Sequence, residues 1–225
     1  SINWLRVMGQ VSYYVWLTKQ FTAPINVAIP SGNFGNAYSA WFGREHGLPI
    51  NEILCSTNVN DVLRRFIDGG VLEPLVTQPS VAPSMDIQIP SSLERLIFDV
   101  SSEAKSFYDQ LQTNSKAQLD EKSIDGLKNI FSSVSFSDVM ITNLITSLHH
   151  VFAIIFDPHS VTSVQMALDN DSSIPTVAVA TASPEKFGNV ISPLINDFTE
   201  SKIEEKEQYL TLGTENNEII EAIKG

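Results

Sequence analysis

The sequence predicts an α/β fold: a parallel sheet flanked by helices, with a helical insertion. Two observations support this class. Over residues 1–70, short apolar segments alternate with amphipathic helical segments, which is the order expected of parallel strands joined by helices. After residue 90 the sequence becomes helical and largely polar outside an apolar stripe, which is typical of a helical layer or insertion.

The first part of the chain shows the clearest alternation. Apolar residues recur at helical spacing from Ile2 to Phe21, and Pro24 ends that helix. The glycines Gly69 and Gly70 end the last helix of this part. The expected elements are a helix over 2–21, a strand over 26–29, a helix over 36–46, a strand over 52–56 and a helix over 62–68.

The remaining elements follow a proline-rich loop over 73–90, whose length is typical of loops with a function. They are helices over 91–112, 122–132, 137–149 and 158–168, a buried strand over 176–180, a helix from Pro184, a strand over 209–212 and a helix over 216–223. The domain organisation we expect is an α/β part over 1–90, the helical layer or insertion over 91–150, and the remainder of the α/β part with a tail over 151–225.

Composition restricts the function classes. The net charge is −12 and the isoelectric point is near 4.6, which argues against nucleic acid and anionic membranes as partners. No apolar run approaches the roughly 20 residues of a membrane span. The single cysteine, Cys55, excludes an intramolecular disulfide and a cysteine-rich metal site, so we expect a reducing, cytoplasmic setting.

The most informative segment is the turn after the first expected strand, Ser31-Gly-Asn-Phe-Gly-Asn36. A turn between a strand and a helix gathers unpaired backbone N–H groups and the positive end of the helix dipole, which together bind anions. We expect Gly32 and Gly35 to allow close approach and positive φ, and Asn33 and Asn36 to add side-chain donors. In so acidic a protein, an anion must be held by local dipoles.

Six segments in this order resemble threonine synthase, a pyridoxal-phosphate (PLP) enzyme of fold type II, the tryptophan-synthase-β type. They are Ser1–Gln10, Val27–Asn36, Thr57–Phe66, Ser84–Ile87, Asp157-Pro-His-Ser160 and Ala180–Phe187. The resemblance covers roughly residues 1–200 and implies that the chain is the C-terminal part of such an enzyme. The complete enzyme would convert O-phosphohomoserine and water to threonine and phosphate, as part of amino-acid biosynthesis.

The resemblance also implies roles for individual residues. The cofactor-binding residues it indicates are Gly32, Asn33, Phe34, Gly35 and Asn36, around the cofactor phosphate, and Thr181, beside the pyridine nitrogen. A neutral hydroxyl at that nitrogen would make the cofactor ring a more moderate electron sink than a carboxylate would. The alternative for Thr181 is a helix-capping role. Ser1, Asn3 and Arg6 match the segment that grips the substrate's phosphate, while a surface ion pair is the alternative for Arg6.

No catalytic residue is expected in this chain, because none of its lysines lies in a context that matches the family's Schiff-base lysine. An N-terminal half of the same polypeptide would supply that lysine, and the chain alone would be inactive. Ser183 and Leu5 depart from the family's usual residues. Two alternatives therefore stay open: a threonine-synthase-like phospholyase acting on a related phosphorylated substrate, and a non-catalytic phosphate-binding module. No metal is expected.

Several polar and aromatic residues are expected to have structural roles. His159 follows Pro158 and is expected to cap or pack a helix, and Tyr13, Tyr14 and Trp16 are expected mostly in the core. Asn58, Asn60 and Asp61 are expected to be turn and cap residues rather than catalysts.

Overall fold

A computed structural model describes residues 3–196 and 198. Its helices and strands, in chain order, are α1 (Trp4–Thr18), β1 (Ile25–Pro30), α2 (Gly35–Glu45), β2 (Ile50–Thr57), α3 (Val62–Gly69), β3 (Val71–Leu72), η1 (Pro83–Met85), α4 (Leu93–Val100), α5 (Ala104–Asn114), β4 (Ala117–Gln118), α6 (Glu121–Lys128), β5 (Phe131–Ser135), α7 (Asp138–Phe152), α8 (Ser160–Leu168), β6 (Thr176–Ala178), η2 (Pro184–Phe187) and α9 (Gly188–Ile191).

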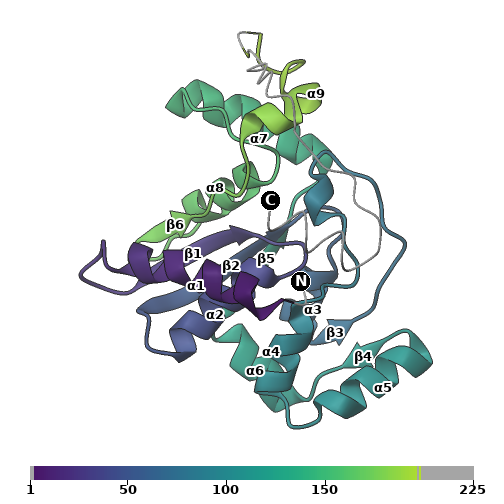
Figure 1. Ribbon diagram of the computed structural model, residues 1–225. Coiled ribbons are helices and arrows are strands. Elements are labelled where there is room, and N and C mark those ends of the chain that lie inside the picture. Colours follow the sequence, from purple (N-terminus) through teal and green to yellow (C-terminus); the bar gives the residue numbers. More distant parts are fainter. Residues whose placement is uncertain (1–2, 197, 199–225) are drawn as a thin grey trace, which may run out of the picture.

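The main sheet is parallel, with the strand order β5-β2-β1-β6. β1 lies in its middle, and all six residues of this strand are buried. β1 pairs with β2 from Ile25 opposite Ile50 to Pro30 opposite Ser56, and with β6 through Ala28 opposite Ala178. Because both neighbours run parallel to β1, the carboxyl ends of the three strands lie at the same edge of the sheet (Figure 1).

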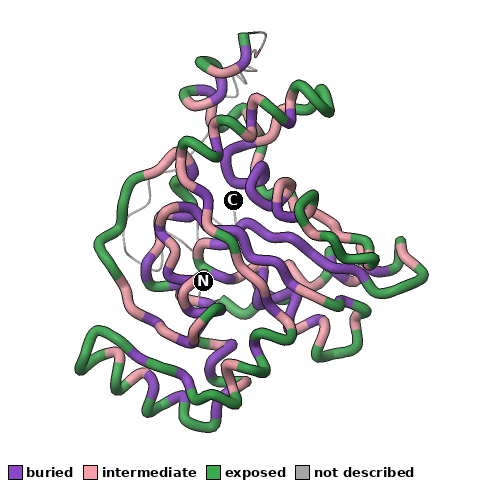
Figure 2. Tube along the Cα trace, turned by 180° about the vertical axis from the view of Figure 1, so that it is seen from behind, coloured by how far each residue is buried: buried purple, intermediate pink, exposed green. Residues whose placement is uncertain are grey.

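Helices cover both faces of this sheet, which explains the continuous apolar run of β1. Val27 and Ile29 belong to the largest hydrophobic cluster, together with residues of α1, α2 and α3. Ala28 and Leu54 point to the other face, where Met166 of α8 packs on them. Figure 2 shows the buried residues concentrated on the strands and the exposed ones on the peripheral helices.

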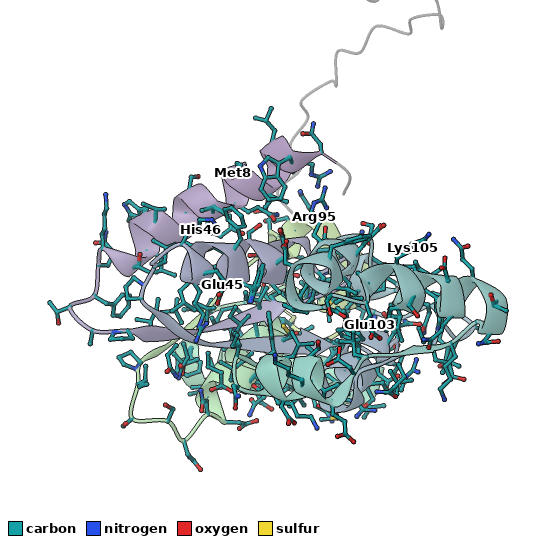
Figure 3. The ribbon with its side chains drawn as sticks, turned by 90° about the horizontal axis from the view of Figure 1, so that it is seen from below. Met8, Glu45, His46, Arg95, Glu103 and Lys105 are labelled. Atoms are coloured by element: carbon teal, nitrogen blue, oxygen red, sulfur yellow. The ribbon has the colours of Figure 1, made fainter. Side chains whose placement is uncertain are left out.

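α1 forms an outer layer over α2, and Figure 3 shows it with the labelled Met8 beyond α2 and the sheet. Trp4, at the start of α1, packs edge-on against Phe42 of α2, and the guanidinium of Arg95 lies 5.8 Å from the Trp4 ring. These contacts place the start of α1 beside the last turn of α2 and beside α4, while Tyr13 and Tyr14, further along α1, contact Asn36 at the start of α2.

A second, smaller core lies at the opposite end of the molecule from α5. It joins α7, α8 and α9 to the loop before α4 through Ile141, Ile145, Val161, Ile191 and Met85. Figure 1 shows α7 and α9 at the top of the molecule and β4 and α5 at the bottom.

The structure corrects the predicted elements between residues 91 and 135. The helix predicted over 122–132 ends at Lys128, and residues 131–135 instead form β5, which extends the main sheet beside β2. The helix predicted over 91–112 is two helices, because Ser101 is extended with φ −120° and ψ 126°. In the described part of the chain, β6 pairs only with β1 and lies at an edge of the sheet. Its three residues are half-buried, so the prediction of a buried strand was wrong.

The loop over 73–90 is held by buried amides at the end of β2. Asn58 Nδ2 donates to Asp86 Oδ1 over 2.6 Å and to Ser80 Oγ over 2.7 Å. Asn60 Nδ2 donates to the same carboxylate over 3.0 Å and to the carbonyl of Gln78 over 2.8 Å. These bonds confirm a structural role for Asn58 and Asn60, and they fix the loop close to the glycine turn.

Among the described residues, no helix combines the length and the apolar character that crossing a membrane requires. The strand predicted over 209–212 and the helix predicted over 216–223 lie outside the described residues.

Candidate functional site

The glycine turn lies at the carboxyl end of β1, where the chain enters α2. The left-handed residue in this turn is Phe34, with φ 66°, and not Gly32 or Gly35, so the prediction of positive φ at the glycines was wrong. The burial of Phe34 explains this conformation: the side chain is 1% exposed, and its ring centroid lies 5.5 Å from that of Phe131. Packing of the aromatic ring therefore holds a backbone conformation that costs about 1 kcal/mol for a residue with a Cβ atom.

Glycine usually lowers stability relative to alanine, because it has more conformational entropy to lose on folding. Here we expect the opposite: Phe34→Gly should be more stable than Phe34→Ala by about 1 kcal/mol. Both variants lose the buried ring equally, but only glycine relieves the positive φ. The measurement is the free energy of unfolding of the full-length variants in urea. An alanine variant at least as stable as the glycine variant would contradict this account.

The two glycines of the turn have different surroundings. A Cβ atom on Gly32 would lie 2.6 Å from the carbonyl oxygen of Ser84 and 3.1 Å from the Cα of Met85. A Cβ atom on Gly35 would lie no closer than 3.5 Å to Ser92 Oγ and 3.6 Å to Gln10 Oε1, which is ordinary contact. Gly32 is therefore required by the loop that packs on the turn, whereas the protein itself leaves space at Gly35.

The turn lines a pocket of about 260 Å³. Its lining residues are Arg6, Val7, Gln10, Pro30, Ser31, Gly32, Asn33, Phe34, Gly35 and Asn36. The first intrahelical bond of α2 runs from Tyr38 N to the Phe34 carbonyl, and no side chain caps this helix. The N–H groups of its first turn therefore lack intrahelical partners. With Arg6 as the cationic side chain in the lining, this donor set fits a phosphate group.

Asn36 is oriented by two tyrosines. Its Oδ1 accepts hydrogen bonds from Tyr13 Oη over 2.7 Å and from Tyr14 Oη. Burial raises the pKa of Tyr13 to about 12 and holds that of Tyr14 well above its usual value, so both hydroxyls stay protonated and donate. Because the amide oxygen is occupied, the Asn36 Nδ2 group is the part of the side chain left to bind an acceptor. The donor role of Asn36 toward a ligand stays a prediction.

A second pocket, of about 410 Å³, adjoins the first, since Gln10 and Asn36 line both. Its other lining residues are Tyr13, Val179, Ala180 and Thr181. Thr181 follows β6, which pairs with β1, so the glycine turn and Thr181 come to the same edge of the sheet. The backbone N–H of Thr181 donates to Ser160 Oγ over 2.9 Å. Its side chain is exposed, and the residue at the N-cap position of η2 is Ser183, so Thr181 does not cap that helix.

The structure brings Arg6 and Thr181 toward the glycine turn, and it shows Asn3 at the start of α1. Asn3 is the N-cap of α1, and its Oδ1 accepts from Leu5 N over 2.9 Å. Asn33 is exposed, and its Oδ1 accepts from Ser91 N and Oγ over 3.5 Å. Ser1 lies outside the described residues.

Sequence reasoning missed Gln10, Tyr13 and Tyr14 as site residues. Gln10 and Tyr13 follow Arg6 by four and seven positions, which places them on the same helix face. That spacing was the available signal. Tyr14 is fully buried, as a core residue would be, yet its hydroxyl binds Asn36.

No protein-family profile matches the chain. Among curated proteins, the chain is 31% identical over 200 residues to threonine synthase from Pseudomonas aeruginosa, which covers 85% of the chain and 43% of that protein. It is 30% identical over 232 residues to threonine synthase from Saccharomyces cerevisiae, covering 91% of the chain and 45% of that protein. Over most of its own length, the chain is thus similar to threonine synthases. It spans less than half the length of these relatives.

Solved threonine synthase structures show the same similarity. PLP-bound threonine synthase from Brucella melitensis superposes with a TM-score of 0.82 at 30% identity, over 86% of the chain and 44% of that structure. Threonine synthase from yeast also superposes with a TM-score of 0.82 at 30% identity, over 94% of the chain and 47% of that structure. A processed threonine deaminase from Solanum lycopersicum shares the fold at 13% identity, with a TM-score of 0.52. The α/β fold is thus that of the fold type II enzymes.

Proposed function

We propose that this chain is the C-terminal half of a threonine synthase that uses PLP to convert O-phosphohomoserine and water to threonine and phosphate. The observation that carries the proposal is the pocket of the glycine turn, which combines uncapped helix N–H groups, Arg6 and the oriented amide of Asn36. A threonine synthase of the same fold binds PLP. The similarity of the chain to threonine synthases supplies the substrate.

The residues of this chain would bind the two ends of the cofactor. Gly32, Asn33, Phe34, Gly35 and Asn36 would hold its phosphate through backbone N–H groups and the Asn36 amide. Thr181 would present a neutral hydroxyl to the pyridine nitrogen, and such a group does not hold that nitrogen protonated as a carboxylate would. When bound, the cofactor supplies an electron sink for carbanions of the substrate.

Ser1, Asn3 and Arg6 are proposed to bind the phosphate of the substrate. Arg6 lines the pocket of the glycine turn, and Asn3 fixes the start of the same helix as its N-cap. A guanidinium binds a phosphate through two parallel hydrogen bonds. Both phosphates would therefore be bound near the first turns of α1, where the general field of this acidic chain gives no help.

The Schiff-base lysine is proposed to come from the N-terminal half of the same polypeptide. No lysine of the described residues lines either pocket. The chain covers 43% and 45% of its two relatives, so the complete protein is proposed to be about twice as long as this stretch. The chain alone is then proposed to be inactive, and the complete enzyme to be a cytoplasmic lyase. The division at residues 90 and 150 remains a proposal about domains.

The test is an assay of the full-length protein with PLP and O-phosphohomoserine. We expect release of inorganic phosphate together with formation of threonine, and an absorption band of protein-bound PLP. Phosphate release without threonine would instead favour a phospholyase. The chain is also 31% identical over 207 residues to threonine synthase-like 1 from Macaca fascicularis, which makes this second outcome a specific alternative. A full-length protein that binds phosphate but no PLP would favour a non-catalytic module.

A further inference from the structure

The start of α8 contacts the segments behind both pockets. Asp157, His159 and Ser160 precede or begin this helix, and their side chains are 1%, 3% and 1% exposed. These three side chains are polar, but none of them lines either pocket. Burying three polar side chains is costly unless their hydrogen bonds are made.

One connection leads from α8 to the glycine turn. Asp157 Oδ1 accepts from His159 Nδ1 over 2.9 Å and from the His159 backbone N–H over 2.9 Å. Since Nδ1 donates, the opposite nitrogen of the ring is free to accept: His159 Nε2 takes a hydrogen bond from the backbone N–H of Ser84 over 3.1 Å. The carbonyl of Ser84 in turn lies against Gly32.

A second connection leads from α8 to Thr181. Ser160 Oγ accepts from Thr181 N over 2.9 Å, and Ser163 Oγ donates to the Val179 carbonyl over 3.1 Å. These two bonds hold the segment that follows β6. The ring of Phe187, a few residues further on, packs against His159 with the centroids 4.8 Å apart.

The burial of Asp157 serves this arrangement. Burial alone would raise its pKa, but hydrogen bonds from His159 and Ser160 hold it below the ordinary value. Its Oδ2 is buried without a hydrogen-bond partner in the described structure. Burying an unpaired oxygen costs free energy of desolvation, which a solvent-exposed helix cap does not lose. The carboxylate fixes the tautomer of His159 and thereby its acceptor toward Ser84.

We infer that the Asp157–His159 pair and Ser160 are positioning residues that place the two halves of the cofactor site independently. His159 positions the phosphate side through Ser84 and Gly32, and Ser160 positions the ring side through Thr181. This inference rests on the proposed function for the identity of the ligand. The two connections themselves are properties of the protein and can be tested without it.

The first test is amide hydrogen exchange in the cofactor-free, full-length protein. His159→Asn keeps a donor toward Asp157 but is too short to accept from Ser84, whereas His159→Gln reaches the place of Nε2 with its amide oxygen. We expect exchange in a peptide that contains Ser84 to be about tenfold faster in H159N, and closer to wild type in H159Q. Equal exchange in the two variants would overturn the connection, whether or not the protein binds PLP.

The second test is PLP binding, followed by the ³¹P resonance of the bound phosphate and by the absorption band of the bound ring. We expect H159N to lower PLP affinity about tenfold and to shift the ³¹P resonance, with recovery in H159Q. We expect Ser160→Ala to shift the absorption band and leave the ³¹P resonance in place. Ser133→Ala, which removes a hydroxyl bond to the Cys55 carbonyl in the sheet, is the control for lost stability.

The outcomes separate the two ideas. A wild-type protein without PLP affinity would refute the proposed function and leave the exchange experiment to decide the positioning role. A wild-type protein that binds PLP, with H159N and S160A changing both signals alike or neither, would refute the independent positioning.

Discussion

Gly35→Val is expected to weaken the binding of PLP to the full-length protein by about 100-fold or more, while its thermal unfolding stays close to wild type. The protein leaves ordinary contact distances around a Cβ atom at this position. Since Gln10 lines the pocket and lies 3.6 Å from that Cβ position, the branched side chain would occupy pocket space. Losing two charge-assisted hydrogen bonds to a phosphate costs about 3–6 kcal/mol.

Gly32→Val is the matched comparison in the same turn. Its Cβ atom would lie 2.6 Å from the Ser84 carbonyl oxygen, so the loop must move and the protein must lose stability as well as affinity. The measurements are PLP titration by absorbance and thermal unfolding of the apoproteins. Unchanged affinity in G35V would show that the turn does not hold the cofactor. A large loss of stability in G35V would show that its surroundings are tighter than the structure indicates.

Asn36→Asp is expected to weaken PLP binding by about 30-fold or more without disturbing the fold. Aspartate keeps the oxygen that Tyr13 and Tyr14 donate to, and the raised pKa of Tyr13, about 12, keeps that donor protonated. The second oxygen replaces the amide donor and places a negative charge beside a bound phosphate. PLP titration of the full-length variant measures the loss.

Asn114→Asp controls for the change of net charge, because Asn114 is exposed at the end of α5 and lines neither pocket. We expect its PLP affinity to match that of wild type. Equal losses in N36D and N114D would mean that only the overall charge matters. A wild-type affinity in N36D would contradict the donor role of Asn36.

Local sequence signals were sufficient for the elements around the glycine turn. β1 is an apolar run buried on both faces, and the turn and α2 follow it directly, so the sequence pattern alone located the pocket. β5 was missed because Phe131-Ser-Ser-Val-Ser135 has little apolar content. Backbone pairing with β2 makes this segment a strand, and such pairing depends on tertiary structure rather than on local propensity.

The parts of the site that sequence reasoning missed depend on packing between distant elements. The positive φ of Phe34 follows from burial of its ring beside Phe131, which no local pattern indicates. The contact of Tyr13 with Asn36 joins α1 to α2, and that of His159 with Ser84 joins elements 75 residues apart. Residue types at helical spacing could indicate a shared face, but not the partner on the other element.

The pairing of β1 with β6 also determines how the entropy cost of assembling the site is divided. Tyr13 meets Asn36 across 23 residues, whereas β1 meets β6 across 150, as in the contact of Asn26 with Thr176. Closing the longer loop costs about 1.7 kcal/mol more in chain entropy. Bringing the Thr181 side to the site therefore loses more chain entropy than bringing Tyr13 to Asn36. A ligand that contacts both sides would stabilise the native state, because it binds only when they are together.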